Sequence, residues 1–332
     1  MGSNSYAIAR ESIRMKDPAV TFEPHRRRLL GVAYRMLGSI SEAEDAVQDA
    51  YLRWHAIDRD TVSDVRAFLT TTTTRICLDT LKSARARRET YVGPWLPEPV
   101  LNTGAFAPDT QSELAEDLSI ALLLALDRLS PLERAAFLLH DVFDFSYSEL
   151  ATTLERSEVA CRQLAARARE HVRAVRPRGS TPPHSGEIDA KHAQLMSAFV
   201  AATRSGDLNA LTQLLASDVR IMSDGGGKVP AALEVLEGSD RVARFLVGVA
   251  RKGWREDFTL RFATINDLPG FIVDGPEGTV QTAAFEIEGD LIRALYVVRN
   301  PDKLRHLTAE LSRRTVADER PGDVQGPRIR MQ

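Results

Sequence analysis

The chain has 332 residues, which at about 150 residues per domain predicts two or three domains. Hydrophobic residues make up 43% and charged residues 27%, a composition that excludes a highly charged, hydrophobe-poor disordered chain. The net charge of −3 excludes a uniformly basic nucleic-acid-binding protein, so any contact with DNA has to come from local basic patches.

Neither the cysteines nor the histidines form a recognisable metal-binding pattern. Cys77 and Cys161 lie far apart in predicted helices, which fits a reducing compartment. The seven histidines make no H-E-x-x-H motif, so we predict no metal site and no cofactor. No apolar run reaches transmembrane length and no signal peptide is visible, so we expect a cytoplasmic protein without membrane contacts.

Two helices are predicted near the N-terminus, after a polar leader. Residues 22–38 repeat apolar side chains at helical spacing, and Gly38 is placed to end that helix. Ser41 and Glu44 match a capping box that would open the next helix. The far face of the second helix is acidic and polar, which indicates either a solvated surface or a protein-docking surface.

Residues 64–89 are predicted to form a third helix with a basic end. The run Thr70–Thr74 opposes this prediction, because β-branched residues lose rotamer freedom in a helix. We still predict a helix, since the apolar residues around the run follow its period. The basic end is either an ordinary helix terminus or a phosphate-binding patch.

The segment 90–111 is predicted to be a linker, and it contains the motif WLPEP. Pro97 and Pro99 favour an extended backbone. Because a tryptophan in a linker is more often docked than exposed, the motif is either an anchor on a neighbouring domain or a dedicated functional element.

Residues 129–175 predict a helix, a short helix over Tyr147–Leu154, a turn and a last helix capped by Ser157. One face of the last helix is apolar, and the other carries arginines and Gln163. Arginine and glutamine can bind guanine and adenine edges, so this face suits a DNA major groove. An ordinary helical pair with a solvated basic face is the alternative.

The Pro/Gly-rich stretch 177–187 marks a domain boundary, and the pattern changes beyond it. Helices are expected over 188–205, 207–216 and 239–252. Strands are expected over 219–222, 258–265, 271–274, 279–287 and 291–299, the last two joined by a hairpin turn at 288–290. This order predicts an α+β domain with helices on one face of a curved antiparallel sheet. Residues 300–304 should end the last strand, and residues 305–332 should form a short helix and a disordered tail.

Four segments in this order resemble the two conserved regions of bacterial extracytoplasmic-function (ECF) RNA polymerase sigma factors: LLGVAYRMLGSISEAEDAVQDAYLRW, RICLDTLKSARARRE, LSPLERAAFLLHDVFDFSYSELA and RSEVACRQLAARARE. The C-terminal part resembles a SnoaL-like, ketosteroid-isomerase-like cone. With WLPEP, DGGGK and NPDKL present, the chain is similar to the sigma-J-like group, whose extension is thought to regulate the sigma part. The resemblance implies a multidomain chain of all-α regions followed by an α+β cone. The implied divisions are a leader (1–21), region 2 (22–89), the linker (90–111), region 4 (112–176), a second linker (177–187), the cone (188–304) and a tail (305–332).

The resemblance also implies partners and residue roles: RNA polymerase core and promoter DNA. Docking on the clamp helices of the largest polymerase subunit would use Asp45, Val47, Gln48 and Leu52. The −10 element would be contacted by Arg75, Asp79, Lys82, Arg85, Arg87 and Arg88. The −35 element would be contacted by Arg156, Ser157, Glu158, Arg162, Gln163 and Arg167.

Regulation would depend on three motifs that we expect to meet in space. They are Trp95, Leu96, Pro97, Glu98 and Pro99; Asp224, Gly225, Gly226, Gly227 and Lys228; and Asn300, Pro301, Asp302, Lys303 and Leu304. DGGGK could also be a simple turn, and it lacks the spacing of a phosphate-binding loop.

Two other functions compete with a sigma factor controlled in cis. An enzymatic cone would need an acid or base in an apolar pocket; Asp224, Asp257, Asp274 and Glu286 are available, but they form no recognisable constellation. We therefore expect a non-catalytic chain. A cone that senses a small molecule would be favoured by a pocket of Phe245, Trp254, Phe262, Phe271 and Phe285, although such aromatics more often form a plain core.

Overall fold

The computed structural model describes residues 17–89, 91–101, 106, 118–175, 190–253, 257–308 and 328–330. The chain divides into two compact units. The first comprises Met1–Arg87 and Thr103–Pro177, and the second comprises Arg88–Asn102 and Arg178–Gln332. The segment that contains WLPEP therefore packs with the C-terminal unit, as the alternative of a linker anchored on a neighbouring domain predicts.

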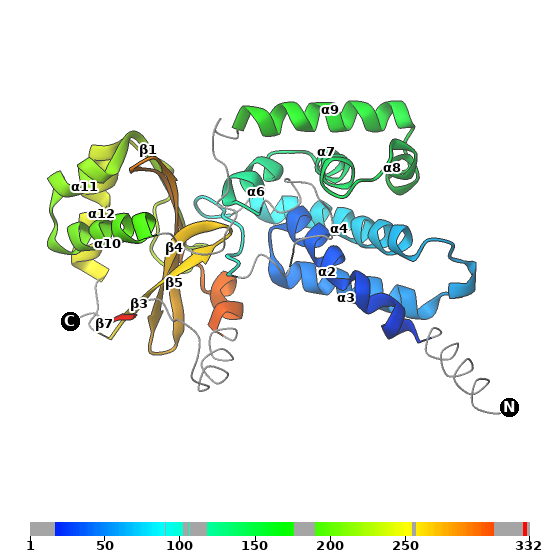
Figure 1. Cartoon of the computed structure of the whole chain (residues 1–332), viewed down its shortest axis with the longest axis horizontal. Coiled ribbons are helices and arrows are strands. Elements are labelled where there is room, and N and C mark those ends of the chain that lie inside the picture. The colour runs from blue at the N-terminus through cyan, green and yellow to red at the C-terminus, as the bar shows by residue number, and fades with distance from the viewer. Residues whose placement is uncertain are drawn as a thin grey trace. The chain divides into compact units, whose positions relative to one another are not determined.

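The first unit is built of helices (Figure 1). Its N-terminal part holds α2 (Pro18–Leu37), α3 (Ile40–Ala56), the short 3₁₀ helix η1 (Arg59–Thr61) and α4 (Val65–Glu89). Its second part holds α6 (Ile120–Asp127), α7 (Pro131–Phe137), a π-helical turn η3 (Leu138–Val142), α8 (Tyr147–Leu154) and α9 (Glu158–Val175). Of the division 112–176 that the resemblance assigned to region 4, residues 112–117 and 176 lie outside the described residues.

The boundary between α2 and α3 confirms one expectation and corrects another. Gly38 ends α2 in the left-handed conformation with a φ of 69°, as its position predicted. The cap of α3 is Ser39, whose side chain accepts a hydrogen bond from the Glu42 backbone N–H, so the expected Ser41 cap is wrong. Starting the helix two residues earlier buries Ile40 in the core, which the sequence pattern alone did not weigh.

The threonine run lies inside α4, as predicted. Thr70 and Thr74 donate hydroxyl hydrogen bonds to the carbonyls of Arg66 and Thr70, one turn earlier in the helix. These bonds satisfy hydroxyls that α4 buries, so the run is compatible with a helix despite its low propensity.

The helix-turn-helix forms as the sequence predicts. The short helix α8 ends at Glu155, which adopts the left-handed conformation with a φ of 54°. The Ser157 hydroxyl accepts a hydrogen bond from the Ala160 N–H and caps α9. Cys161, Ala165 and the other apolar residues of α9 face inward, which leaves its polar side exposed.

The second unit is an α+β cone. Its helices are α10 (Ala190–Ser205), α11 (Leu208–Leu214), α12 (Ser239–Gly253) and one over 301–308. Its strands are β1 (Leu215–Asp224), β2 (Leu236–Glu237), β3 (Thr259–Ile265), β4 (Leu268–Gly275), β5 (Gly278–Glu288), β6 (Leu291–Val298) and β7 (Arg328–Arg330). They form one sheet in the order β2-β1-β6-β5-β4-β3-β7.

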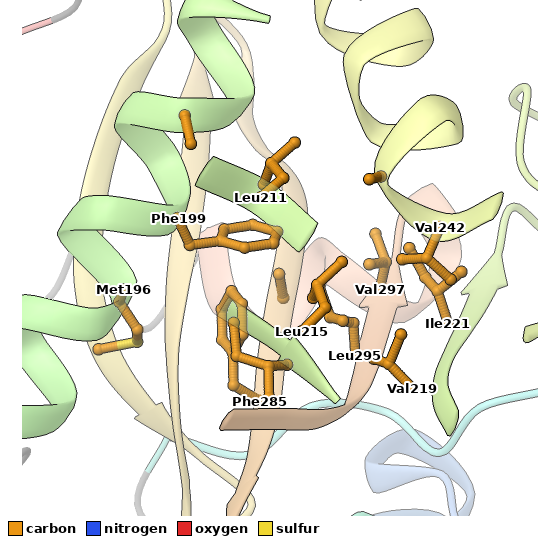
Figure 2. Packing of buried hydrophobic residues seen from close by; sticks show 14 of the residues in the cluster. Met196, Phe199, Leu211, Leu215, Val219, Ile221, Val242, Phe285, Leu295 and Val297 are labelled. Atoms are coloured by element: carbon orange, nitrogen blue, oxygen red, sulfur yellow. The ribbon is translucent and has the colours of Figure 1, made fainter. Parts of the chain in front are cut away.

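The core of the cone lies between the helices and one face of the sheet. Figure 1 shows α10, α11 and α12 together on that face. Figure 2 shows their side chains packed on alternate residues of the strands, with Phe199 of α10 and Phe285 of β5 at its centre. The rings of these two residues meet edge to face with centroids 5.1 Å apart.

Three features of the cone differ from the expectations. β1 pairs with β6 in parallel, whereas a fully antiparallel sheet was expected. Residues 301–304 do not end the last strand but lie in the helix over 301–308. Within the expected tail, β7 pairs with β3, while residues 309–327 lie outside the described residues. The two strand pairings depend on partners that are distant in sequence, which a local pattern does not reveal. The helix has a local signal, since the Asn300 side chain accepts a hydrogen bond from the Asp302 N–H and Pro301 stands at its first position.

Candidate functional site

The exposed side of α9 carries the side chains that were expected to contact the −35 element. Gln163 and Arg167 are exposed there, and Arg156 is exposed in the turn that precedes α9. Arg162 pairs with Glu158 at 2.9 Å, and its guanidinium lies 5.0 Å from the centre of the Tyr147 ring. The Ser157 hydroxyl is used as the helix cap. This side therefore presents arginines and an amide. Two of the arginines, Arg162 and Arg167, are oriented by ion pairs with Glu158 and Glu133.

Arg167 is one of these, because it binds a carboxylate at the start of α7. Its Nε lies 2.8 Å from Glu133 Oε1, and Glu133 also accepts hydrogen bonds from Ser130 in a capping box. The hydrogen bond from Arg167 holds the pKa of Glu133 below its usual value. The pair orients Arg167 while its side chain stays 54% exposed.

The helix α4 carries the side chains that were expected to contact the −10 element. Asp79 and Lys82 are exposed and pair with each other at 2.7 Å. The side chains of Arg85, Arg87 and Arg88 lie outside the described residues. Of this set, the structure therefore places only Arg75, Asp79 and Lys82.

Arg75 contacts the C-terminal end of α8 within the first unit. Its guanidinium donates hydrogen bonds to the carbonyls of Thr152 and Thr153, at 3.0 and 3.1 Å, and pairs with Glu155 at 3.1 Å. Thr71 adds a hydroxyl hydrogen bond to Thr153 at 2.9 Å. A helix C-terminus attracts cations because its last carbonyls are unpaired and carry partial negative charge.

The candidate polymerase-docking residues on α3 divide into two groups. Asp45, Gln48 and Leu52 are exposed, and Leu52 is unusual for a large apolar side chain because 55% of it is accessible. Val47 is fully buried, which corrects the expectation that it lies on the docking surface. Its position on the opposite side of the helix lets it anchor α3 to the core.

The parallel pairing of β1 with β6 explains why two of the three motifs meet. Asp224 ends β1 and lies opposite Val298 at the end of β6. The carboxyl ends of parallel neighbours lie at the same edge, so the segments that follow them are adjacent. Accordingly, the backbone N–H groups of Arg299 and Asn300 both donate to the Asp224 carbonyl, at 2.8 and 2.9 Å.

The buried carboxylate of Asp224 joins this edge to the segment 91–100. Its Oδ1 accepts hydrogen bonds from the Tyr91 hydroxyl at 2.6 Å and the Gly226 N–H at 3.0 Å. Its Oδ2 accepts from the Leu96 N–H at 2.9 Å. Burial, followed by the nearby Asp224 carboxylate, raises the pKa of Tyr91, so the phenol keeps its proton and remains a donor.

Lys303 neutralises Asp224 and binds the same segment. Its ammonium lies 2.7 Å from Asp224 Oδ2 and donates to the Leu96 carbonyl, while only 9% of the side chain is exposed. It also lies 4.4 Å from the centre of the Trp95 ring and 5.1 Å from that of Tyr91. One lysine therefore contacts the carboxylate, the backbone and two aromatic rings.

The middle glycine of DGGGK, Gly226, is needed because the chain passes very close to Asn300 there. Gly226 has a φ of +61°, and a Cβ there would lie 2.2 Å from the Asn300 side-chain nitrogen. That nitrogen donates to the Tyr91 hydroxyl at 2.9 Å, and Lys228 pairs with Asp302. Backbone freedom at this position thus permits the contact between the motifs.

Two residues that the sequence analysis did not single out bind the other end of the segment. Asn266 accepts a hydrogen bond from the Val100 N–H at 3.0 Å through Oδ1, and its own N–H donates to the Val100 carbonyl at 2.8 Å. The His306 ring nitrogen Nε2 lies 2.8 Å from the Pro99 carbonyl. A sequence signal did exist for the first, since Asn266-Asp267 between two apolar runs is typical of a hairpin turn.

The acids that an enzymatic cone could use are engaged in the structure. Asp274 binds Arg261 and the Thr279 hydroxyl, and Glu286 accepts a hydrogen bond from Tyr296 at 2.9 Å. Phe271 and Phe285 pack against each other in the core, with ring centroids 5.6 Å apart. Of the proposed pocket, Trp254 lies outside the described residues.

Two features are absent from the described part of the chain. No group of three or more histidine, cysteine, aspartate or glutamate side chains is placed to hold a metal ion. Among the described helices, none is long and apolar enough to cross a membrane.

Comparisons with known proteins agree with this arrangement. The family model for Sigma-70 region 2 matches residues 21–87, and that for Sigma-70 region 4 matches residues 119–172. The chain is 40% identical over 294 residues to the ECF RNA polymerase sigma factor SigJ of Mycobacterium tuberculosis H37Rv, covering 85% of this chain and 91% of the relative. It is 32% identical over 300 residues to the probable ECF RNA polymerase sigma factor SigI of M. tuberculosis CDC 1551, covering 89% and 98%.

The fold agrees as well. The crystal structure of M. tuberculosis SigJ matches with a TM-score of 0.64 at 34% identity, over 85% of this chain and 96% of that one. The helical regions are thus followed by a C-terminal cone of the SnoaL-like type in a single chain. By sequence, by family model and by structure, the chain belongs to the ECF RNA polymerase sigma factors.

Proposed function

We propose that this sigma factor binds polymerase and promoter through three helical surfaces and that its cone controls them in cis by holding the segment 91–100. The docking surface for polymerase is the exposed face of α3, with Asp45, Gln48 and Leu52. An exposed leucine among acidic and amide side chains supports this role, because apolar anchors surrounded by polar residues dominate protein interfaces.

The −35 contact is assigned to the exposed side of α9. Arg162 and Gln163 are exposed near the N-terminal end of α9, which supports the assignment because the N-terminal residues of a recognition helix contact base edges. Each such base contact contributes about 1–3 kcal/mol of discrimination. To test this, Arg162→Ala is compared with Arg173→Ala, an exposed arginine near the end of the same helix, in run-off transcription with core polymerase. A loss confined to Arg162→Ala is expected, and equal activity of the two variants contradicts the assignment.

The −10 contact is assigned to α4, which has to separate from α8 for this purpose. Elements 25 base pairs apart lie about 85 Å from each other along B-form DNA, at 3.4 Å per base pair. In the first unit, however, Arg75 of α4 hydrogen-bonds to α8 directly. We therefore infer that the two DNA-binding parts move apart when polymerase carries them to a promoter.

Control in cis is supported mainly by the buried contacts of Asp224. These contacts attach the segment 91–100, which connects the two DNA-binding parts, to the cone. They include a charge pair between Asp224 and Lys303 that is almost completely removed from water. A segment held in this way fixes the direction in which the chain continues toward the helix-turn-helix.

The decisive experiment measures promoter-directed transcription by three proteins: the full chain, the chain ended after Gly186, and the full-length Asp224→Ala variant. The matched control is Asp218→Ala, because Asp218 lies on the same strand but is exposed and pairs only at the surface with Arg293. We expect altered activity or promoter choice for the truncated chain and for Asp224→Ala, and no change for Asp218→Ala. Unchanged transcription by both removes the regulatory proposal.

A further inference from the structure

The segment 91–100 is attached to the cone at two places, and only the first of them joins all three motifs. The first attachment joins Leu96 to Asp224 and Lys303. The second joins Val100 to Asn266 and Pro99 to His306, at the end from which the chain leaves the second unit. The bonds from Asn266 to Val100 are buried, so they do not compete with water.

Both attachments bind the backbone of the segment. Pro97 and Pro99 have no N–H, so this stretch cannot pair as a regular strand at the sheet edge. The N–H groups of Leu96 and Val100 instead donate to side-chain oxygens, and the carbonyls of Leu96, Pro99 and Val100 accept from the cone. The prolines keep the backbone extended between the two attachments, which sets their spacing.

Asn266 has the geometry of a dedicated clamp. It is completely buried and forms the first residue of the two-residue turn between β3 and β4, with a φ of 49°. Asparagine tolerates this conformation and, unlike glycine, also supplies a side-chain oxygen. The Asn266 side-chain oxygen accepts from the Val100 N–H, and the Asn266 N–H donates to the Val100 carbonyl. Because both bonds go to one residue, they fix the register of the segment.

We propose that Asn266 and His306 form a second clamp that fixes the exit end of the segment and opens independently of the clamp made by Asp224 and Lys303. The segment can therefore be released in two steps. Pro99 and Val100 can detach and free the chain that leads to the helix-turn-helix, while Leu96 stays bound to Asp224 and Lys303. The consequence for transcription rests on the proposed control in cis, but the existence of the clamp does not.

The test is hydrogen exchange on the full-length protein. Asn266→Gly keeps the turn conformation but removes the oxygen, so the Val100 amide should exchange at least about fivefold faster, the effect of losing one hydrogen bond. The Leu96 amide should be unaffected. Asp224→Ala should accelerate exchange at Leu96 more than at Val100, because the two amides share the general destabilisation of the second unit but only Leu96 loses its acceptor. The control is Asp290→Gly, which alters the two-residue turn between β5 and β6, where the Asp290 side chain pairs at the surface with Lys191. This variant should change the exchange rate of neither amide.

Two results overturn the clamp: unchanged exchange at Val100 in Asn266→Gly, or equal acceleration at Val100 and Leu96. His306→Ala provides a second variant, which should accelerate exchange at Val100 without affecting Leu96. Run-off transcription from promoters with different −10 to −35 spacings then tests the link to function. Faster exchange at Val100 with unchanged transcription at every spacing would keep the clamp but refute its regulatory role.

Discussion

Removal of the Asp224 carboxylate provides the sharpest test of the contacts of Asp224, Asn300 and Lys303 with the segment 91–100, which we call the linker site. In Asp224→Ala, Lys303 would keep its charge in a place where only 9% of its side chain reaches water, and the Leu96 N–H would lose its acceptor. Breaking a buried ion pair by removing one partner costs about 3–5 kcal/mol. We expect a loss of this size in the free energy of unfolding of the second unit.

The measurement is native-state hydrogen exchange of the β6 amides, which reports unfolding of that unit separately from the helical one. Asp218→Ala is the control, because the Asp218 side chain is 68% exposed and a surface pair contributes about 0–1 kcal/mol. If Asp224→Ala and Asp218→Ala destabilise β6 equally, Asp224 does not carry the energy that its contacts indicate, and the linker site is only a surface contact.

Three further predictions concern other parts of the chain. Gly226→Ala should cost about 1–2 kcal/mol in the same exchange experiment, because φ is positive and Asn300 occupies the space of the new Cβ; wild-type stability would show that the loop moves freely. Glu133→Gln should lower stability at pH 7 by about 1 kcal/mol, and since the folded pKa of Glu133 lies below its unfolded value of about 4.3, the difference should vanish as the pH falls through the folded value. Urea titrations at pH 7 and pH 3 measure this, and an equal difference at both would contradict the role of the Arg167 pair. Leu52→Asp should weaken binding of core polymerase about tenfold in a competition assay with unchanged stability, and unaltered affinity would exclude α3 from the interface.

The helical unit was largely predictable because its signals are local. Helical period, Gly38 and the Ser157 cap specify elements through neighbours within four residues. The start of α3 shows the limit of such signals. Ser39-x-x-Glu42 and Ser41-x-x-Glu44 both match a capping box, and burial of Ile40 decides between them.

The linker site was predictable as a set of residues but not as a geometry. Resemblance to the sigma-J-like group pointed to the three motifs, whereas the physical reason for their meeting is the parallel pairing of β1 with β6. Strand partners separated by about 70 residues leave no trace in local periodicity. Asn266 and His306 were missed for the same reason, since their function depends on where Val100 and Pro99 lie in the folded protein.

The placement of residues 91–100 within the C-terminal unit has a consequence for biosynthesis. Lys303 follows Leu96 by 207 positions. At 5–20 residues per second, a ribosome needs roughly 10–40 s to make the intervening chain. The second helical region is made within that interval, so both helical regions are complete before Lys303, while the stretch around Trp95 and Leu96 still lacks its binding surface. Under the control in cis proposed above, a nascent chain that meets polymerase during this interval is not yet controlled, because Lys303 has not been made.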